Sequence, residues 1–164
     1  MSNNPQTTTI TLASPSHLNA VTDLVTLAYT PYLARLNGKK PAPMTADYAS
    51  LIGSSCVYIL STSSTTSTSP IVLGCVSLVL NAKGDALEIN NLAVSPKAQG
   101  KGYGKLLMRF AEDVATEKRL KRLELYTNVR MVENLVLYKK LDYEEVGRWS
   151  EDGFDRVFFV KELL

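Results

Sequence analysis

Apolar residues alternate with polar ones in several short stretches of the chain and recur every three or four residues in others. Alternation is typical of half-buried strands, and the longer spacing is typical of helices that bury one face. The first pattern and β-branched runs predict strands at 7–13, 56–60, 71–80, 86–94, 122–127, 143–149 and 156–160. The second predicts helices from Ser14-Pro15 to near Pro31, around 47–52, over 104–118 and over 131–141.

Turn signals separate these elements. Ser14-Pro15 supplies a helix cap followed by a proline at the first helical position, and Asp152-Gly153 is typical of a tight hairpin turn. The polar Ser/Thr-rich tract at 61–70 cannot bury enough apolar surface to order itself, so it is predicted to be a flexible hairpin loop. The predicted order is β-α-α-β-β-β-α-β-α-β-β. Hairpins at both ends of a β-α-β-α centre indicate an α+β fold with a mixed sheet.

The composition fits one ordinary domain. With 164 residues, of which 45% are hydrophobic and 21% charged, the chain is long enough to bury a core, and we expect a single domain over 1–164. The net charge of +2 is too small to indicate a nucleic-acid or membrane partner. The first residues lack the pattern of a signal peptide, and no stretch reaches the roughly 20 apolar residues of a membrane span. The expected location is therefore cytoplasmic.

Cysteine and histidine are scarce. Cys56 and Cys75 are the only cysteines, and His17 is the only histidine. Each cysteine lies in a strand-like run, so we expect two reduced, buried thiols rather than a disulfide. Without a second histidine or a cysteine pair at ligand spacing, no metal site is predicted. His17 is expected at the surface, near the start of the first helix.

Three glycines stand at alternate positions in Gln99-Gly-Lys-Gly-Tyr-Gly-Lys105, between a predicted strand and a predicted helix. Unpaired N–H groups at a helix N-terminus attract anions, and glycine lets a ligand approach the backbone. The local excess of Lys and Arg over 97–122 suits a compact anion, with a solvated helix face as the alternative. The spacing fits neither a Walker A loop nor the dinucleotide fingerprint, because Leu106 and Lys105 stand where those motifs need other residues.

The segment Gln99-Gly100-Lys101-Gly102-Tyr103-Gly104, preceded by "LAVSP", resembles the Gln/Arg-x-x-Gly-x-Gly signature of the GNAT superfamily of N-acetyltransferases. The run "LELYTNVRMVENLVLYKKLDYEEVGR" at 123–148 is similar to the strand, helix and "LYxxLGY" segment that follow in that superfamily. The resemblance covers about residues 86–160. It implies the GNAT fold, acetyl-CoA as cosubstrate without a metal, and direct transfer of an acetyl group to a primary amine in a ternary complex.

The resemblance also assigns coenzyme-binding residues by position. Leu92 and Val94 are implied to make main-chain contacts with the pantetheine arm. The pyrophosphate is implied to bind the loop residues Gln99, Gly100, Lys101, Gly102, Tyr103, Gly104 and Lys105. Two positions depart from the superfamily pattern. The first is Met131, which stands where an asparagine is common. Asn134 is therefore expected to take over a coenzyme contact, or else to be a plain helix-surface residue. Asp142 replaces the usual glycine and is expected to end a helix in the left-handed conformation.

Two catalytic residues follow from the resemblance. Tyr138 falls where the superfamily has its general acid, near the coenzyme sulfur, although helical spacing also allows a half-buried core aromatic. Glu88 lies five residues before Ala93, the spacing at which some protein-acetylating members carry a glutamate base. Strand alternation predicts that Glu88, Asn90 and Leu92 share one face. An exposed edge glutamate is the alternative.

The acceptor is predicted from the N-terminal half. Its aromatic and acidic residues Tyr32, Asp47 and Tyr48 are candidates to enclose an amine, and a turn that packs its tyrosines on the core is the alternative. We expect a small-molecule acceptor. A protein lysine or N-terminus is the second possibility, and a non-catalytic coenzyme A sensor is the third. Nucleic acid and membrane are not expected as partners, and the chain is expected to be a monomer or a homodimer.

Overall fold

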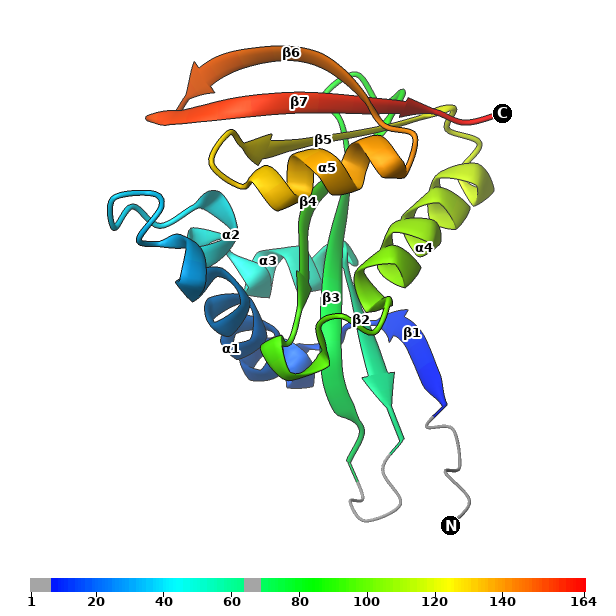
Figure 1. Cartoon of the computed structure of the whole chain (residues 1–164). Helices are drawn as coiled ribbons and strands as arrows, with labels where there is room; N and C mark the ends of the chain where they lie inside the picture. The colour runs from blue at the N-terminus through cyan, green and yellow to red at the C-terminus, as the bar shows by residue number, and fades with distance from the viewer. Residues whose placement is uncertain (1–6, 64–68) are drawn as a thin grey trace.

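A seven-stranded mixed sheet carries helices against both faces (Figure 1). The computed structural model describes residues 7–63 and 69–164. The strands are β1 (Thr8–Leu12), β2 (Val57–Thr62), β3 (Ile71–Leu80), β4 (Leu87–Val94), β5 (Arg122–Asn128), β6 (Glu144–Glu151) and β7 (Phe154–Glu162). The α-helices are α1 (Leu18–Tyr29), α2 (Ala42–Thr45), α3 (Tyr48–Gly53), α4 (Tyr103–Glu117) and α5 (Val132–Lys140), with 3₁₀ turns at Pro15–His17, Thr30–Tyr32 and Pro96–Ala98.

The strand order is β1-β2-β3-β4-β5-β7-β6, and β4 and β5 form the one parallel pair among neighbouring strands of the described chain. The predicted α+β fold and order of elements are confirmed, and α2 is an additional single turn that follows Pro41 and contains Pro43. The hairpin turn is also confirmed, because Asp152 and Gly153 have φ values of 52° and 78°. The loop predicted at 61–70 begins after Thr62 in the structure, and residues 64–68 lie outside the described residues.

Two apolar clusters lie on opposite faces of the sheet. On one face, α4 packs against a cluster that includes Leu60, Val76 and Leu107. On the other face, α1 and α3 pack against a cluster that includes Ile59 and Cys75. Ile59 and Leu60 are neighbours in β2, so the alternation of a strand sends them to opposite faces. The predicted apolar faces of both long helices are therefore used, one on each side.

A β-bulge at Asn90 reverses the facing of side chains along β4. Glu88 lies opposite Val79 of β3, and Asn91 lies opposite Ser77. Ser77 and Val79 are two residues apart on their strand, so Glu88 and Asn91 share one face. Leu92 points to the other face. The prediction that Glu88, Asn90 and Leu92 share a face is therefore wrong, because the bulge inserts one residue into the alternation.

β4 and β5 separate after a short parallel contact. Their register joins only Leu87 to Leu123 and Glu88 to Glu124. Beyond this point β4 stays paired with β3 up to Val94, whereas β5 follows β7. In Figure 1, β5, β7 and β6 run across the top of the view while β2, β3 and β4 descend from it. The edge of β4 that faces β5 is therefore open along its second half.

Candidate active site

The glycine loop predicted from the sequence leads into the N-terminus of α4. Gly102 occupies the N-cap position with a φ of 84°, and Gly100 has a φ of 78°. A side chain would be strained in this left-handed region, which explains both glycines. A Cβ atom at either position would meet nothing within 4 Å, so the surface over the loop is open.

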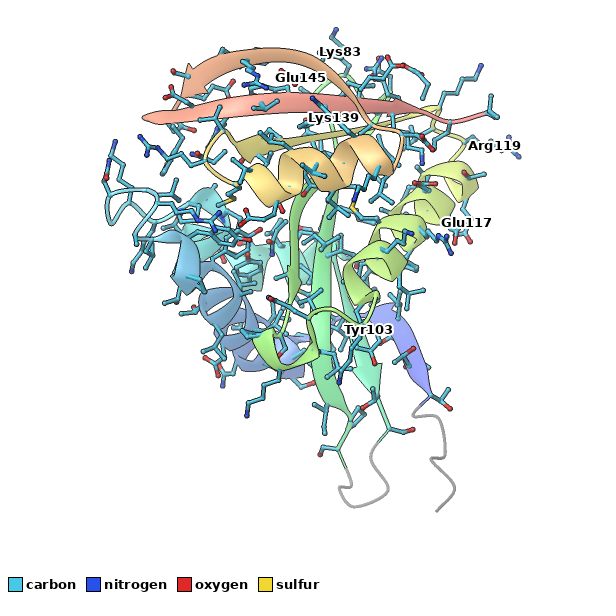
Figure 2. All side chains as sticks on the ribbon, in the orientation of Figure 1. Lys83, Tyr103, Glu117, Arg119, Lys139 and Glu145 are labelled. Atoms are coloured by element: carbon cyan, nitrogen blue, oxygen red, sulfur yellow. The ribbon has the colours of Figure 1, made fainter. Side chains whose placement is uncertain are left out.

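The first turn of α4 presents backbone N–H groups to this surface. Leu106 donates to the Gly102 carbonyl at 3.0 Å and makes the first helical hydrogen bond. The N–H groups of Tyr103, Gly104 and Lys105 come before it and have no helical carbonyl one turn earlier. Figure 2 shows Tyr103 at this end of α4. Together with the partial positive charge of a helix N-terminus, these groups form a site suited to a phosphate group.

The main chain of β4 directs further N–H groups to the gap beside β5. Ser95, just after β4, donates to the Leu73 carbonyl of β3 at 2.8 Å. Because N–H directions alternate along a strand, those of Leu92 and Val94 point away from β3. The Val94 carbonyl accepts a hydrogen bond from Gln99 Nε2 at 3.2 Å, which ties the glycine loop to the strand. The open edge therefore offers two main-chain donors next to the loop.

Two cavities adjoin in this gap. The loop-side cavity has a volume of about 100 Å³ and reaches Val94 and Gln99, and the central cavity has a volume of about 60 Å³ and reaches Arg156. Both are lined by Tyr29, Leu92, Asn134 and Tyr138. Asn134 donates from Nδ2 to Thr127 Oγ1 at 3.2 Å, which fixes its side chain at the junction. Tyr138 and Asn134, both predicted from the sequence, therefore lie where the two cavities meet.

Aromatic contacts hold the half-buried Tyr138 side chain in place. Its ring centroid lies 5.6 Å from that of Phe159 and 6.0 Å from that of Tyr143. Burial, with a smaller effect of Tyr32, raises the pKa of Tyr138 to about 12. The phenol is therefore protonated throughout the neutral range and is available as a hydrogen-bond donor.

The C-terminus of α5 fixes the backbone of the same residue. Tyr143 N–H donates to the Tyr138 carbonyl at 3.0 Å, and Asp142 N–H donates to the Lys139 carbonyl at 3.2 Å. Asp142 has a φ of 65°. These bonds and this conformation form a Schellman motif, which is usually made with glycine. The prediction that Asp142 ends the helix in the left-handed conformation is confirmed.

A chain of hydrogen bonds forms one wall of the central cavity. Tyr29 donates its hydroxyl proton to Asn91 Oδ1 at 3.0 Å, and Asn91 Nδ2 donates to the Tyr48 hydroxyl at 3.1 Å. Tyr48 in turn donates to the Pro43 carbonyl at 2.7 Å. Burial raises the pKa of both tyrosines, so both hydroxyls keep their protons. Asn91 was missed from the sequence, because only the bulge turns it toward these partners.

The predicted acceptor residues do not all meet at the cavities. Tyr32 lines the loop-side cavity. Tyr48 lines a separate cavity of about 130 Å³ and reaches the central one only through its hydrogen bonds. Asp47 caps α3, accepts a hydrogen bond from Ser50 N–H at 3.0 Å and is exposed. Its two hydrogen bonds from Ser50 lower the pKa of Asp47, and the cap explains this carboxylate without a ligand.

Glu88 lies in a fourth hollow, the sheet-face recess, which has a volume of about 490 Å³. This recess is also lined by Glu124, Tyr126, Trp149 and Phe158. Burial, with repulsion from Glu124, raises the pKa of Glu88. The recess borders the central cavity through Tyr126, which lines both, but Glu88 itself lines neither the central nor the loop-side cavity. The structure therefore separates the predicted base from Tyr138.

Arg156 is a buried cation that the sequence analysis did not single out. It is 5% exposed and lines the central cavity. Its guanidinium carbon lies 4.2 Å from the centroid of the Tyr126 ring, and its Nη1 donates to Glu151 at 3.0 Å. The available signal was its place as the one charged residue at the start of the apolar run "RVFFV".

The profile of the Acetyltransferase (GNAT) family matches residues 21–143. The matched span is most of the chain and contains the glycine loop, the open edge of β4 and Tyr138. The chain belongs to this family. The resemblance inferred from the sequence is thereby confirmed, and so is the GNAT fold, in which a mixed sheet carries flanking helices.

Individual GNAT relatives are more distant. The chain is 30% identical over 83 residues to "Probable N-acetyltransferase 14" of Xenopus tropicalis, a match that covers 51% of this chain and 40% of the relative. It is 30% identical over 91 residues to "IAA acetyltransferase" of Azospirillum brasilense, covering 56% and 60%. The chain thus spans less than two thirds of these relatives. The PaiA N-acetyltransferase of Thermoplasma acidophilum, solved with coenzyme A, shares the fold with a TM-score of 0.74 at 15% identity, covering 95% of this chain and 99% of that one.

Other expectations concern absent features. Across residues 7–63 and 69–164, no helix combines the length and the apolar character that a membrane span needs. The same ranges contain no group of three or more His, Cys, Asp or Glu side chains placed to hold a metal ion.

Cys56 and Cys75 are free thiols, and burial raises the pKa of Cys75 to about 12. His17 accepts a hydrogen bond at Nδ1 from Ser14 N–H at 2.9 Å and thereby helps to begin the first helix.

Proposed function

We propose that the protein transfers an acetyl group from acetyl-CoA to a primary amine of a small molecule. The observation that carries this proposal is convergence: the glycine loop, the open edge of β4 and Tyr138 meet at two adjoining cavities. Acyl transfer needs a held coenzyme, a polarised thioester carbonyl and a hydrogen-bond donor for the leaving sulfur. Each of these three features supplies one of the needs.

The coenzyme would lie from the glycine loop into the gap. The N–H groups at the start of α4 would bind the pyrophosphate, with Lys101 and Lys105 as supporting charges. Leu92 and Val94 would donate from the main chain, the pantetheine arm would fill the loop-side cavity beside Gln99, and acetyl-CoA would supply the acetyl group as a thioester. A donor aimed at the developing oxyanion is worth about 3 kcal/mol. No metal is needed for this chemistry.

Tyr138 would stabilise the departing sulfur. A thiol has a pKa of roughly 8.5, whereas the buried phenol has a pKa of about 12. The phenol thus holds its proton more firmly than the thiol does. Its contribution is a hydrogen bond to the thiolate as negative charge develops, and the proton that the thiolate finally takes comes from the nitrogen of the acceptor, which must lose one after its attack on the thioester.

The amine must lose a proton before it attacks. Glu88 is our candidate base, because its raised pKa makes it a better proton acceptor near neutral pH than an ordinary carboxylate. Since Glu88 lines only the sheet-face recess, it would take the proton from an amine, or from an intervening water, on that side of Tyr126. The acceptor would then approach from the recess toward the central cavity.

Two observations support a small acceptor. The central cavity, which Pro41, Ala42 and Pro43 help to line, has a volume of only about 60 Å³. One relative is named "IAA acetyltransferase", whose name specifies a compound rather than a protein acceptor. A protein lysine or N-terminus is the second candidate acceptor class.

The proposal is tested first by calorimetric titration with acetyl-CoA. The wild type is expected to bind with a micromolar dissociation constant, and the double variant Gly102→Asp with Gly104→Asp is expected to lose binding, because it adds two carboxylates over the N–H groups. Gly84→Asp is the matched control, since Gly84 also has a positive φ of 72° with open space around it but lies in the β3–β4 turn. Binding to wild type and control leads to a screen of amines by thiol release. Equal binding by the double variant, or none by the wild type, would sink the proposal.

A further inference from the structure

Arg156 is an unusual residue to find in the wall of the central cavity. Its side chain is 6% exposed, and taking a guanidinium out of water is costly unless it is well compensated. The carboxylates that compensate the positive charge contact only one of its three nitrogen atoms. Nη1 donates to Glu151 Oε2 at 3.0 Å and lies 3.5 Å from Asp152 Oδ2, and both carboxylates are largely exposed.

The other edge of the same guanidinium has no protein partner. Within residues 7–63 and 69–164, Arg156 Nε and Nη2 make no hydrogen bond. Both atoms keep some solvent-accessible surface. The fully buried side-chain nitrogen and oxygen atoms that lack a partner in this part of the chain are Ser77 Oγ and Tyr143 OH, and neither arginine atom is among them. The open space that Arg156 borders is the central cavity. Arg156 and Tyr138 therefore line the same cavity, and two parallel N–H donors of Arg156 have no partner among the described residues.

Aromatic rings fix the plane of this cation. The guanidinium carbon lies 4.2 Å from the centroid of the Tyr126 ring and 5.8 Å from that of the Phe154 ring. Stacking leaves the in-plane donors of arginine available, and the Nε and Nη2 pair matches the two oxygens of a carboxylate. A point cation such as lysine would have neither the plane nor the paired donors.

We infer that the acceptor amine carries a carboxylate, and that Arg156 binds this carboxylate while Tyr138 faces the reacting end. This inference rests on the proposed function, which it deepens by naming an amino-carboxylate as the substrate class. The other explanation for Arg156 is purely structural: its bonds to Glu151 and Asp152 tie β7 to the β6–β7 turn. Only the first explanation predicts that the unchanged wild-type protein distinguishes an acceptor with a carboxylate from one without it.

The test compares acceptors that differ in one group. The ω-amino acids from glycine to 6-aminohexanoate are matched with their amides, which have the same shape without the charge, and with the corresponding diamines. Wild-type protein is expected to prefer the carboxylate at one chain length, through KM. Arg156→Gln is expected to lose about ten- to a hundredfold in kcat/KM on that acceptor and little on its amide. Arg156→Lys should recover only part of the loss.

A second variant separates recognition from the structural role. Glu151→Gln with Asp152→Asn removes the turn contacts and keeps the guanidinium, so it should retain the preference for the carboxylate. The inference is overturned if wild type acetylates the amide as well as the carboxylate at every length, or if Arg156→Gln slows both equally. It is also overturned if diamines are preferred, because the second amine would then be bound by Glu88 and Glu124.

Failure of the proposed function would be visible separately. If no amine in the set is acetylated, saturation-transfer NMR with hexanoate and hexanamide still tests the site on the protein saturated with coenzyme A. Contact of hexanoate with the wild type, lost in Arg156→Gln and absent for hexanamide, would keep the anion site and discard the reaction. No contact in the wild type would discard the anion site as well.

Discussion

At the residue scale, the hydroxyl of Tyr138 holds its proton firmly, because burial raises its pKa to about 12. The Tyr138 ring packs against Phe159 and Tyr143, and its position at the junction of two cavities is the ground on which we propose a chemical role for its hydroxyl. The two roles belong to different atoms of the same side chain. Removing the oxygen alone separates them, because phenylalanine keeps the ring contacts.

Tyr138→Phe is therefore expected to lower kcat for thiol release by about a hundredfold or more, the usual range for a lost hydrogen-bond donor to developing negative charge, with unchanged affinity for acetyl-CoA. In the wild type, the donor is present below its pKa and lost as the pH rises through about 12, so Tyr138 causes no alkaline loss of rate up to about pH 11. Steady-state kinetics over this pH range, with calorimetry for the coenzyme, measure both effects.

Tyr143→Phe is the control for that substitution. Its hydroxyl is buried without a hydrogen-bond partner among the described residues, in a side chain that is 2% exposed. Removing this oxygen should leave kcat unchanged and raise the free energy of unfolding by about 1 kcal/mol. If both variants lose activity equally, the packing of the aromatic cluster explains the loss and the donor role of Tyr138 is contradicted.

At the element scale, the two ends of helices that border the site are built differently. The N-terminus of α4 uses glycine at its cap, which leaves backbone donors uncovered. The C-terminus of α5 uses Asp142 in the left-handed conformation, where an L-residue costs roughly 1–2 kcal/mol and aspartate somewhat less. Only the first departure from ordinary capping would be explained by the coenzyme binding that we propose.

Asp142→Gly is accordingly expected to stabilise the protein. Glycine adopts the required φ without strain, so the free energy of unfolding should rise by about 0.5–1 kcal/mol, or a few degrees in Tm. Asp142→Ala, which lacks both the flexibility of glycine and the local hydrogen bonding of aspartate, should lower Tm. Thermal unfolding of the three proteins gives the order, and a Tm for the glycine variant below that of wild type would show that the aspartate side chain has a stabilising contact of its own.

The sequence predicted elements better than it predicted their meeting points. Strand and helix periods depend on neighbours in the chain, so the order of elements could be anticipated, and the family resemblance implied the left-handed Asp142. The bulge at Asn90 depends on the pairing of β4 with β3, which no local pattern contains, and it moved Leu92 away from Glu88. Arg156 became visible only when β7 was placed beside β5, because its significance lies in the cavity it borders.

At the scale of the whole molecule, β4 and β5 touch over only two residue pairs, so few sheet bonds join the two halves of the sheet. A second link lies at the mouth of the gap. Arg35, in the connection between α1 and α2, forms paired hydrogen bonds of 2.6 and 2.7 Å with Glu133 at the start of α5. Its guanidinium also lies 5.3 Å from the centroid of the Tyr32 ring, which lines the loop-side cavity. The ion pair therefore connects the N-terminal helices to the helix that carries Tyr138.

This link gives the molecule a specific sensitivity to acid. The hydrogen bonds from Arg35 lower the pKa of Glu133 to about 2 from its ordinary value of 4.5. The stabilisation is therefore fully present above about pH 4.5 and is lost as the pH falls toward 2, because the unfolded chain binds the proton first. The pair is exposed, so the effect is small and weakens with added salt.

Glu133→Gln should be less stable than the wild type above pH 5, and the two should converge as the pH approaches 2. Urea unfolding across this range, at low and high salt, measures the difference. Glu117→Gln is the control, since Glu117 is exposed on α4 and makes no salt bridge with a described residue, and it should follow the wild type at every pH. If the difference in the free energy of unfolding between Glu133→Gln and wild type persists unchanged to pH 2, helix packing rather than the ion pair is its cause. Convergence confined to the Glu133 variant would show that the two halves are joined across the gap by charge.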